Sequence, residues 1–181
     1  ADIRHVFVTH IHLDHAGGAG WWAQQGSQIY VHPNGAKHLI DPSKLLASAE
    51  RVYGQMMDDL WGQMLPTPQE RVTVVEDSEE IQAEGLKIFA LDTPGHAYHH
   101  HTFRIGNSAF TGDASGVRTP NSSLITLPAP PPEFNLEAWH KTLSRLLHEG
   151  FAAIFPTHFG AVNHVREHLE EFTSHLSQAA E

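Results

Sequence analysis

The strongest indication of the fold is the segment Thr9-His10-Ile11-His12-Leu13-Asp14-His15. It follows the apolar run 6–8 and gathers three imidazoles and a carboxylate within six residues. Alternate side chains of extended backbone point the same way, so His10, His12 and Asp14 would share one side. A turn after Leu13 could then bring His15 round to join them.

A hydrated loop that happens to be rich in histidine is the alternative interpretation of this stretch. Neutral imidazole and carboxylate, however, are preferred ligands of zinc and its first-row neighbours. A buried cluster of such groups would be costly without a metal. The stretch therefore predicts a metal site.

Three further motifs follow along the chain: Thr93-Pro94-Gly95-His96, Thr111-Gly112-Asp113 and Pro156-Thr157-His158-Phe159-Gly160. With the opening His-x-His-x-Asp-His, they resemble the signature of the metallo-β-lactamase fold superfamily over essentially the whole chain. The resemblance implies an α/β fold, a four-layer αββα sandwich, as a single domain over residues 1–181. Members of this family place several strands before the first motif. Only residues 3–8 could do so here, so we expect the N-terminal strands to be missing from this chain.

The resemblance also implies a ligand set for two divalent metal ions. His10, His12 and His96 would hold one ion, Asp14, His15 and His158 the other, and Asp113 would bridge them. Zinc is the expected metal, with iron or manganese as alternatives for this nitrogen and oxygen donor set. The chain has no cysteine. Within the resemblance this excludes the subgroup with a cysteine ligand and favours the glyoxalase II-like one with a bridging aspartate.

Two cations roughly 3.5–4 Å apart can lower the pKa of a bridging water towards neutrality and stabilise a developing oxyanion. Together with this chemistry, the resemblance to glyoxalase II-like hydrolases implies a metal-dependent hydrolase whose bridging hydroxide cleaves an ester, thioester or lactone. Asp113 and Asp14 are the catalytic candidates, and Asp14 could accept the proton. The alternatives are a mononuclear iron sulfur dioxygenase, a metal-dependent nuclease or phosphodiesterase, and a non-enzymatic metal-binding module.

Other residues are candidates for a supporting role. His99 and His100 could orient metal ligands or contact substrate, since metal ligands need orienting partners. The helical pattern at 41–65 carries an apolar stripe, which general burial tendencies favour as core. It could instead be a lid, with Tyr53 and Trp61 contacting substrate. We expect a solvated face for His164 and His168.

Length and composition set the remaining expectations. A chain of 181 residues suits one domain, and its net charge of −10 argues against a nucleic-acid partner. The sequence shows no apolar run of transmembrane length and no signal peptide. We expect a small-molecule substrate, no membrane partner and a cytoplasmic location, with a homodimer left open.

Hydrophobic periodicity and turn residues predict alternating strands and helices, typical of an α/β domain. A helix is expected from the Asn135 cap to Gly150. Before this helix, a loop is expected from Gly112 to Glu133. The expected strands are 3–8, 28–32, 72–75, 86–91, 101–105, 108–111 and 151–155, and the other expected helices are 21–25, 33–40, 41–65 and 162–176.

Overall fold

The structure is a computed structural model of the chain, and it describes residues 2–119, 124–128 and 133–179. The chain divides into two compact units, Ala1–Glu76 and Asp77–Glu181. Each unit has its own sheet and its own hydrophobic cluster.

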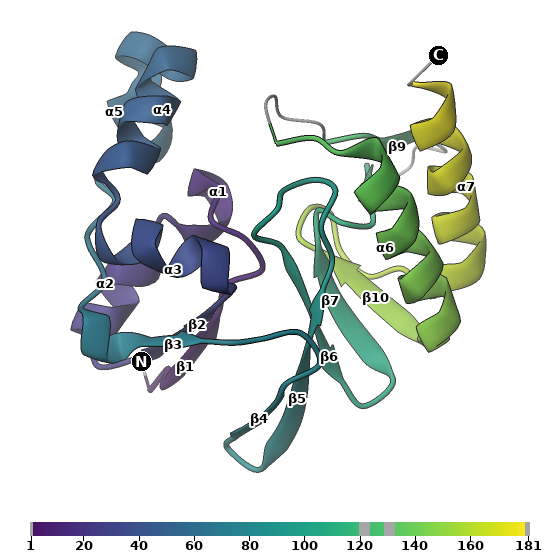
Figure 1. Cartoon of the computed structure of the whole chain (residues 1–181), viewed down its shortest axis with the longest axis horizontal. Coiled ribbons are helices and arrows are strands. Elements are labelled where there is room, and N and C mark those ends of the chain that lie inside the picture. The colour runs from purple at the N-terminus through teal and green to yellow at the C-terminus, as the bar shows by residue number, and fades with distance from the viewer. Residues whose placement is uncertain (1, 120–123, 129–132, 180–181) are drawn as a thin grey trace. The chain divides into compact units, whose positions relative to one another are not determined.

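The first unit is built on a parallel sheet of three strands in the order β1-β2-β3. Neighbouring parallel strands need a crossover connection, which here is largely helical. The buried side chains of Ile29 and Val31 in β2 and of Leu39 in α3 belong to its core. Its elements (Figure 1) are β1 (His5–Phe7), α1 (Leu13–Ala16), α2 (Ala19–Gln24), β2 (Gln28–Val31), α3 (Pro33–Ile40), α4 (Ser43–Tyr53), η1 (Gly54–Met56), α5 (Met57–Trp61), η2 (Gln69–Arg71) and β3 (Val72–Val74).

The second unit contains a mixed sheet in the order β10-β7-β6-β5-β4. β10 is parallel to β7, whereas β7, β6, β5 and β4 pair antiparallel in turn. β5, β7 and β10 therefore run in the same direction. The elements are β4 (Glu80–Ala83), β5 (Leu86–Asp92), β6 (His101–Ile105), β7 (Ser108–Gly112), β8 (Val117–Arg118), β9 (Ile125–Thr126), α6 (Leu136–Glu149), β10 (Ala153–Pro156) and α7 (Val165–Gln178).

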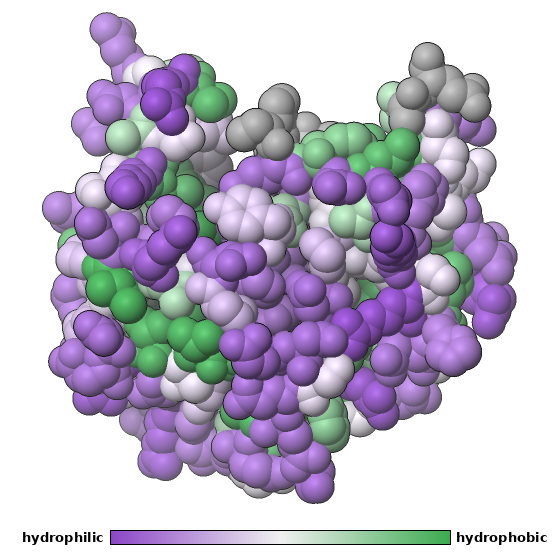
Figure 2. All heavy atoms as spheres, viewed as in Figure 1, coloured by the Kyte–Doolittle hydropathy of each residue, from purple (hydrophilic) through white to green (hydrophobic). Residues whose placement is uncertain are grey.

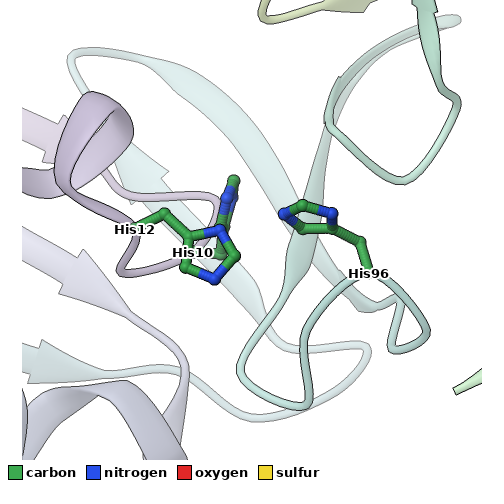
Figure 3. A group of neighbouring side chains, drawn as sticks. All are labelled: His10, His12 and His96. Carbon is green, nitrogen blue, oxygen red and sulfur yellow. The ribbon is translucent and has the colours of Figure 1, made fainter. Parts of the chain in front are cut away.

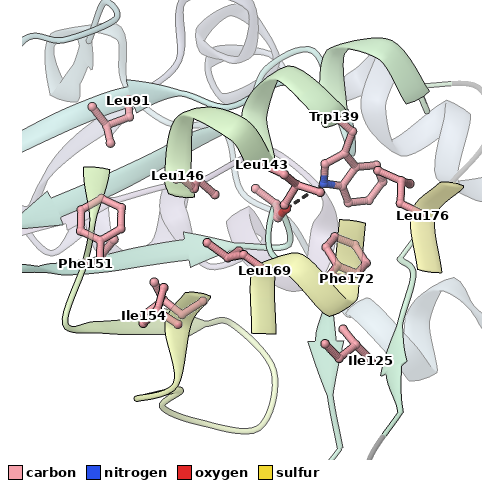
Figure 4. Packing of buried hydrophobic residues seen from close by; sticks show 13 residues of the cluster. Leu91, Ile125, Trp139, Leu143, Leu146, Phe151, Ile154, Leu169, Phe172 and Leu176 are labelled. Carbon is pink, nitrogen blue, oxygen red and sulfur yellow. Dashed lines mark hydrogen bonds between the residues drawn. The ribbon is translucent and has the colours of Figure 1, made fainter. Parts of the chain in front are cut away.

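Helices α6 and α7 lie side by side and cover the sheet of the second unit (Figure 1). Their buried faces pack with Ala109 of β7 and Ile154 of β10 (Figure 4). Asn135 caps α6 by accepting a hydrogen bond from the Ala138 backbone N–H at 3.0 Å. Gly150 ends α6 with a left-handed φ of 65°. The sequence prediction for this helix is confirmed.

Most of the predicted strands and helices are confirmed within one to three residues at their ends. The prediction that residues 112–133 are all loop is wrong, because β8 and β9 pair there in an antiparallel two-stranded sheet. Strand β4 was also missed. Such short strands exist only through pairing with another strand, which hydrophobic periodicity does not report. Residues 129–132 of the proline-rich run lie outside the described part of the chain.

The apolar stripe of the 41–65 segment is the next correction. The segment is largely helical, as α4, η1 and α5. Val52 is 74% exposed, Met56 56% and Leu60 48%, so the expectation that the stripe belongs to the core is wrong for these residues. An amphipathic pattern identifies an apolar face but not what covers it. The lid role stays a prediction.

His168 is the third correction. His164, which directly precedes α7, is exposed as expected, but His168 within α7 is only 1% exposed. Its Nε2–H donates to the Ser115 carbonyl at 2.8 Å, and Arg118 Nε donates to its Nδ1 at 3.3 Å. Burial lowers the pKa of His168 and the Arg118 charge adds to this, against the opposing Ser115 hydrogen bond and Glu171 charge. His168 is a buried, neutral anchor.

The face drawn in Figure 2 is mostly hydrophilic, with smaller hydrophobic areas between the polar side chains. Among the described residues, none of the helices combines the length and the apolar character needed to cross a bilayer.

Two leucines of the first unit test the corrected view of its core. Leu39→Ala should destabilise the protein by about 2–5 kcal/mol, because Leu39 is fully buried. Leu60→Ala should change the free energy of unfolding by no more than about 0.5 kcal/mol. Urea unfolding of both variants measures this, and equal losses would show that α5 is packed after all.

The buried His168 predicts a pH dependence of stability. Its folded-state pKa lies below the unfolded value, so the unfolded chain binds more protons at mildly acidic pH. Its contribution is therefore complete above an unfolded pKa of about 6.5 and is lost as pH falls below that value. In metal-free protein, the stability advantage of wild type over His168→Gln should shrink between about pH 7.5 and 5.5. A difference independent of pH would contradict the assignment.

Candidate metal centre

Three strands of the second unit deliver predicted ligands to one edge of its sheet. Because β5, β7 and β10 run in the same direction, their carboxyl ends meet at the same edge, where sites of α/β folds commonly lie. His96 lies in the loop after β5, Asp113 directly follows β7, and His158 follows β10. The topology thus gathers residues that are up to 62 positions apart in the sequence.

The Asp113 carboxylate lies between two imidazoles. Its Oδ2 is 3.5 Å from His96 Nε2, and its Oδ1 is 3.6 Å from His158 Nε2. Both distances exceed the usual 2.7–3.2 Å of an N–H···O hydrogen bond. Ligand atoms about 2.0–2.1 Å from one tetrahedral metal are themselves roughly 3.3–3.4 Å apart. The two carboxylate oxygens are therefore spaced from two different imidazoles much as co-ligands are.

The orientation of His96 strengthens this point. Its Nδ1 lies 2.6 Å from the Pro128 carbonyl, which can only accept, so Nδ1 carries the proton. In the neutral ring Nε2 then presents a lone pair to the Asp113 carboxylate. Both groups are at least 94% buried. A backbone carbonyl on the other ring nitrogen is the usual support of a metal-binding histidine, and here it leaves Nε2 as the ring nitrogen that faces Asp113.

Helix α6 fixes the loop that carries His96. The Gly95 carbonyl accepts from the Asn135 backbone N–H at 2.9 Å, and Thr142 donates to the Pro94 carbonyl at 2.6 Å. Gly95 has a φ of 137°, and a Cβ there would lie 2.4 Å from Cα of Trp139. Only glycine allows this approach. The Trp139 ring then packs edge-on against His96, with centroids 5.7 Å apart.

The loop after β7 fixes Asp113 in a comparable way. The Asp113 backbone N–H donates to His100 Nε2 at 3.2 Å. Nε2 therefore lacks a proton in this arrangement, and Nδ1–H is left to donate to Thr93 Oγ1 at 2.8 Å. His100 and Thr93 are both fully buried. His100 is therefore hydrogen-bonded directly to the backbone of Asp113, the predicted bridging residue.

The first unit holds the other predicted ligands. Figure 3 shows His10 and His12 on the loop after β1, and His96 on the loop after β5. The rings of His10 and His12 have centroids 4.5 Å apart, and those of His10 and His15 3.9 Å. The expectation that Asp14 continues an extended backbone is wrong, because α1 begins at Leu13, directly after His12. The helical turn still keeps His15 beside His10.

Asp14 and His15 form a pair within this cluster. His15 Nε2 lies 3.2 Å from Asp14 Oδ2, and the Asp14 side chain is 38% exposed. Burial acts to raise the pKa of Asp14, but the hydrogen bond and charge of His15 outweigh it and hold the pKa below its ordinary value. Asp14 is thus a partly solvated carboxylate that is ionised at neutral pH.

The remaining candidates are His99, Tyr53 and Trp61, and each lies beside another described side chain. His99 is 1% exposed and its Nε2 lies 3.1 Å from Glu133 Oε2, a carboxylate that sequence reasoning missed. The rings of Tyr53 and Trp61, predicted to contact substrate, have centroids 5.2 Å apart in the first unit.

Sequence reasoning also missed Trp139 and Pro128. The helical spacing of Trp139 predicts a core residue, and Trp139 does belong to the core. Its ring also packs against His96, a predicted ligand. A backbone carbonyl such as that of Pro128 leaves no signal in the sequence at all.

The donor chemistry of both clusters suits divalent metal ions. Imidazole nitrogens and carboxylate oxygens are borderline donors of the kind that zinc, iron and manganese accept. In the first unit, ligand atoms of His10 lie within 4.8 Å of those of His12 and of His15. In the second unit, Asp113 offers one oxygen towards each of two imidazoles. The residues that are present therefore fit such ions.

Comparison with known proteins identifies relatives. The chain is 28% identical over 178 residues to the metallo-beta-lactamase fold-containing protein ST1585 of Sulfurisphaera tokodaii, covering 95% of this chain and 67% of that protein. The crystal structure of ST1585 superposes with a TM-score of 0.82 at 27% identity, over 100% of this chain and 70% of that one.

Two further relatives have names that describe an activity. An atrochrysone carboxyl ACP thioesterase of Aspergillus fumigatus is 26% identical over 181 residues, which are 99% of this chain and 33% of that protein. The probable metallo-hydrolase MJ0888 of Methanocaldococcus jannaschii is 29% identical over 114 residues, or 62% of this chain and 49% of that protein. The chain thus spans from a third to two thirds of the length of these three relatives.

The family model described as the metallo-beta-lactamase superfamily matches residues 1–158. The predicted α/β fold class is confirmed by this match and by the superposition on ST1585. From the motifs, the fold and these comparisons together, the chain belongs to the metallo-β-lactamase superfamily.

Proposed function

We propose that this protein is a dinuclear metallohydrolase that cleaves an ester, thioester or lactone. The observation that carries the proposal is the position of Asp113, whose two oxygens face His96 and His158 at 3.5 and 3.6 Å. A carboxylate that faces a different imidazole with each oxygen is suited to bridging two ions. A single structural ion would need only one of these pairs.

The proposed ligand set is the one implied by the sequence motifs. His10, His12 and His96 would hold one ion, Asp14, His15 and His158 would hold the second, and Asp113 would bridge them. Family membership supports the assignment, because the matched region runs from residue 1 to residue 158 and includes every one of these residues. We propose zinc as the metal, with iron or manganese able to use the same donors.

The chemistry of such a site divides between the ions and the chain. Divalent ions held there would supply Lewis acidity and a lowered pKa for water. Asp14, ionised and partly solvated, is positioned to accept a proton and release it to solvent. His100, by its hold on the Asp113 backbone, keeps the bridging carboxylate from turning away. Preorganisation of this kind lowers the cost of reorganisation during the reaction.

An acyl substrate is favoured over a nucleic acid. A net charge of −10 does not suit a polyanionic partner. One relative is named a thioesterase, which supports acyl chemistry at this fold. The proposed substrate is therefore a small ester, thioester or lactone. Hydrolysis of phosphodiesters alone would instead indicate a phosphodiesterase, and sulfur oxidation would indicate a dioxygenase.

Replacing Asp113 should disable the centre. Asp113→Ala is expected to reduce bound metal from two ions per chain to one or fewer. It should also lower kcat/KM by about 10³-fold or more, because several kcal/mol of transition-state stabilisation would be lost. Elemental analysis and steady-state kinetics measure the two effects. His164→Ala, an exposed histidine outside the set, is the matched control and should leave both unchanged.

Metal removal and restoration test the reaction itself. Chelator-treated protein should lose hydrolysis of at least one substrate in a panel of esters, thioesters, lactones and phosphodiesters, and zinc, manganese or iron should restore it. Oxygen uptake with iron but no hydrolysis would identify a dioxygenase. Retained metal with no turnover across the panel would leave a binding module and defeat the proposal.

A further inference from the structure

The segment that follows Asp113 is held by ring nitrogens from two helices. The Ala114 carbonyl accepts from Trp139 Nε1–H of α6 at 2.7 Å, as the dashed line in Figure 4 shows. The next carbonyl, that of Ser115, accepts from His168 Nε2–H of α7 at 2.8 Å. Two consecutive carbonyls immediately after the predicted bridging residue are thus tied to side chains from distant parts of the chain.

Both donors are fixed in place. Trp139 is fully buried and His168 is 1% exposed, so neither ring can swing into solvent without opening the core. Arg118 Nε donates to His168 Nδ1 at 3.3 Å, which leaves Nε2 as the protonated nitrogen of the neutral ring. Arg118 is itself paired with Glu171, one turn further along α7. The hydrogen bond to Ser115 therefore has a defined direction.

The remaining bonds in this segment show that it has little freedom. Ala114 N–H donates to the Thr111 carbonyl and Gly116 N–H to the Asp113 carbonyl, both at 3.1 Å. The hydroxyls of Thr111 and Ser115 lie 2.7 Å apart. These local bonds close the turn on itself, whereas the bonds to Trp139 and His168 attach the turn to the helices. Both sets of bonds act on the backbone that carries Asp113.

From this arrangement we infer that His168, acting with Trp139, is a positioning residue for metal binding. Resting on the dinuclear site proposed above, the inference adds that helix α7 sets the affinity of that site through the Ser115 carbonyl. His168 is not a ligand and does not touch Asp113. Its effect passes through the backbone of residues 113–115, and loss of the bond lets the carboxylate sample directions in which it cannot span two ions.

The test compares two replacements of His168. His168→Gln keeps an N–H donor for Ser115 and an acceptor for Arg118, whereas His168→Leu removes both. Zinc affinity, measured by competition with a chromophoric chelator, should be about fivefold to tenfold weaker at the weaker site in the Leu variant. It should be within twofold of wild type in the Gln variant. His164→Leu, at an exposed position directly before α7, is the matched control and should bind like wild type.

A second measurement does not depend on any variant. Nitrogen-15 NMR of histidine in metal-free wild-type protein should show His168 as the neutral Nε2–H tautomer at pH 7.5. A signal for the Nδ1–H tautomer or for imidazolium would overturn the inference, even if the Leu variant does not fold. Its failure is separable from that of the proposed function. Wild type that takes up no metal defeats the function, whereas tight binding in folded His168→Leu defeats only the positioning role.

Discussion

The second unit places one buried carboxylate, that of Asp113, between the imidazoles of His96 and His158. The Pro128 carbonyl accepts a hydrogen bond from His96 Nδ1–H, so Nε2 is the ring nitrogen that faces the Asp113 carboxylate. Both groups are removed from water, and an imidazole and a carboxylate in such a place are donors that a divalent cation would suit. The surrounding chain must therefore hold both side chains in place.

Helix α6 holds the segments that carry both side chains. That helix fastens the His96 loop through Asn135 and Thr142, and it fastens the Asp113 turn through the Trp139 indole. One helix thus fixes at once two loops that carry predicted ligands. The close approach of Trp139 requires glycine at position 95, so packing and chemistry constrain the same residues. A core mutation in α6 should for this reason affect the predicted centre and not only stability.

Sequence could predict those features whose cause is local or whose motif is short. The Asn135 cap and the Gly150 end of α6 follow from backbone chemistry, and the predicted ligands after β5, β7 and β10 lie in short motifs that resemble those of the family. Strands β8 and β9 were missed because a two-residue strand exists only through its partner. The exposed stripe at Val52, Met56 and Leu60 was assigned to the core because periodicity reports a face and not its neighbour.

His164 and His168 show most directly where local reasoning ends. The two residues have the same type and lie four positions apart around the start of α7, so a pattern treats them alike, yet one is exposed and the other is 1% exposed. Of the two, His168 is the one that donates to the Ser115 carbonyl, which is 53 residues away in the sequence. A backbone carbonyl is common to all residues, so the sequence does not reveal this contact. A buried histidine is tolerated only when both ring nitrogens are satisfied, and here Ser115 and Arg118 satisfy them. The environment of a titratable residue is thus fixed by partners from elsewhere in the fold, and in this protein those partners adjoin the residue most important to the proposed centre.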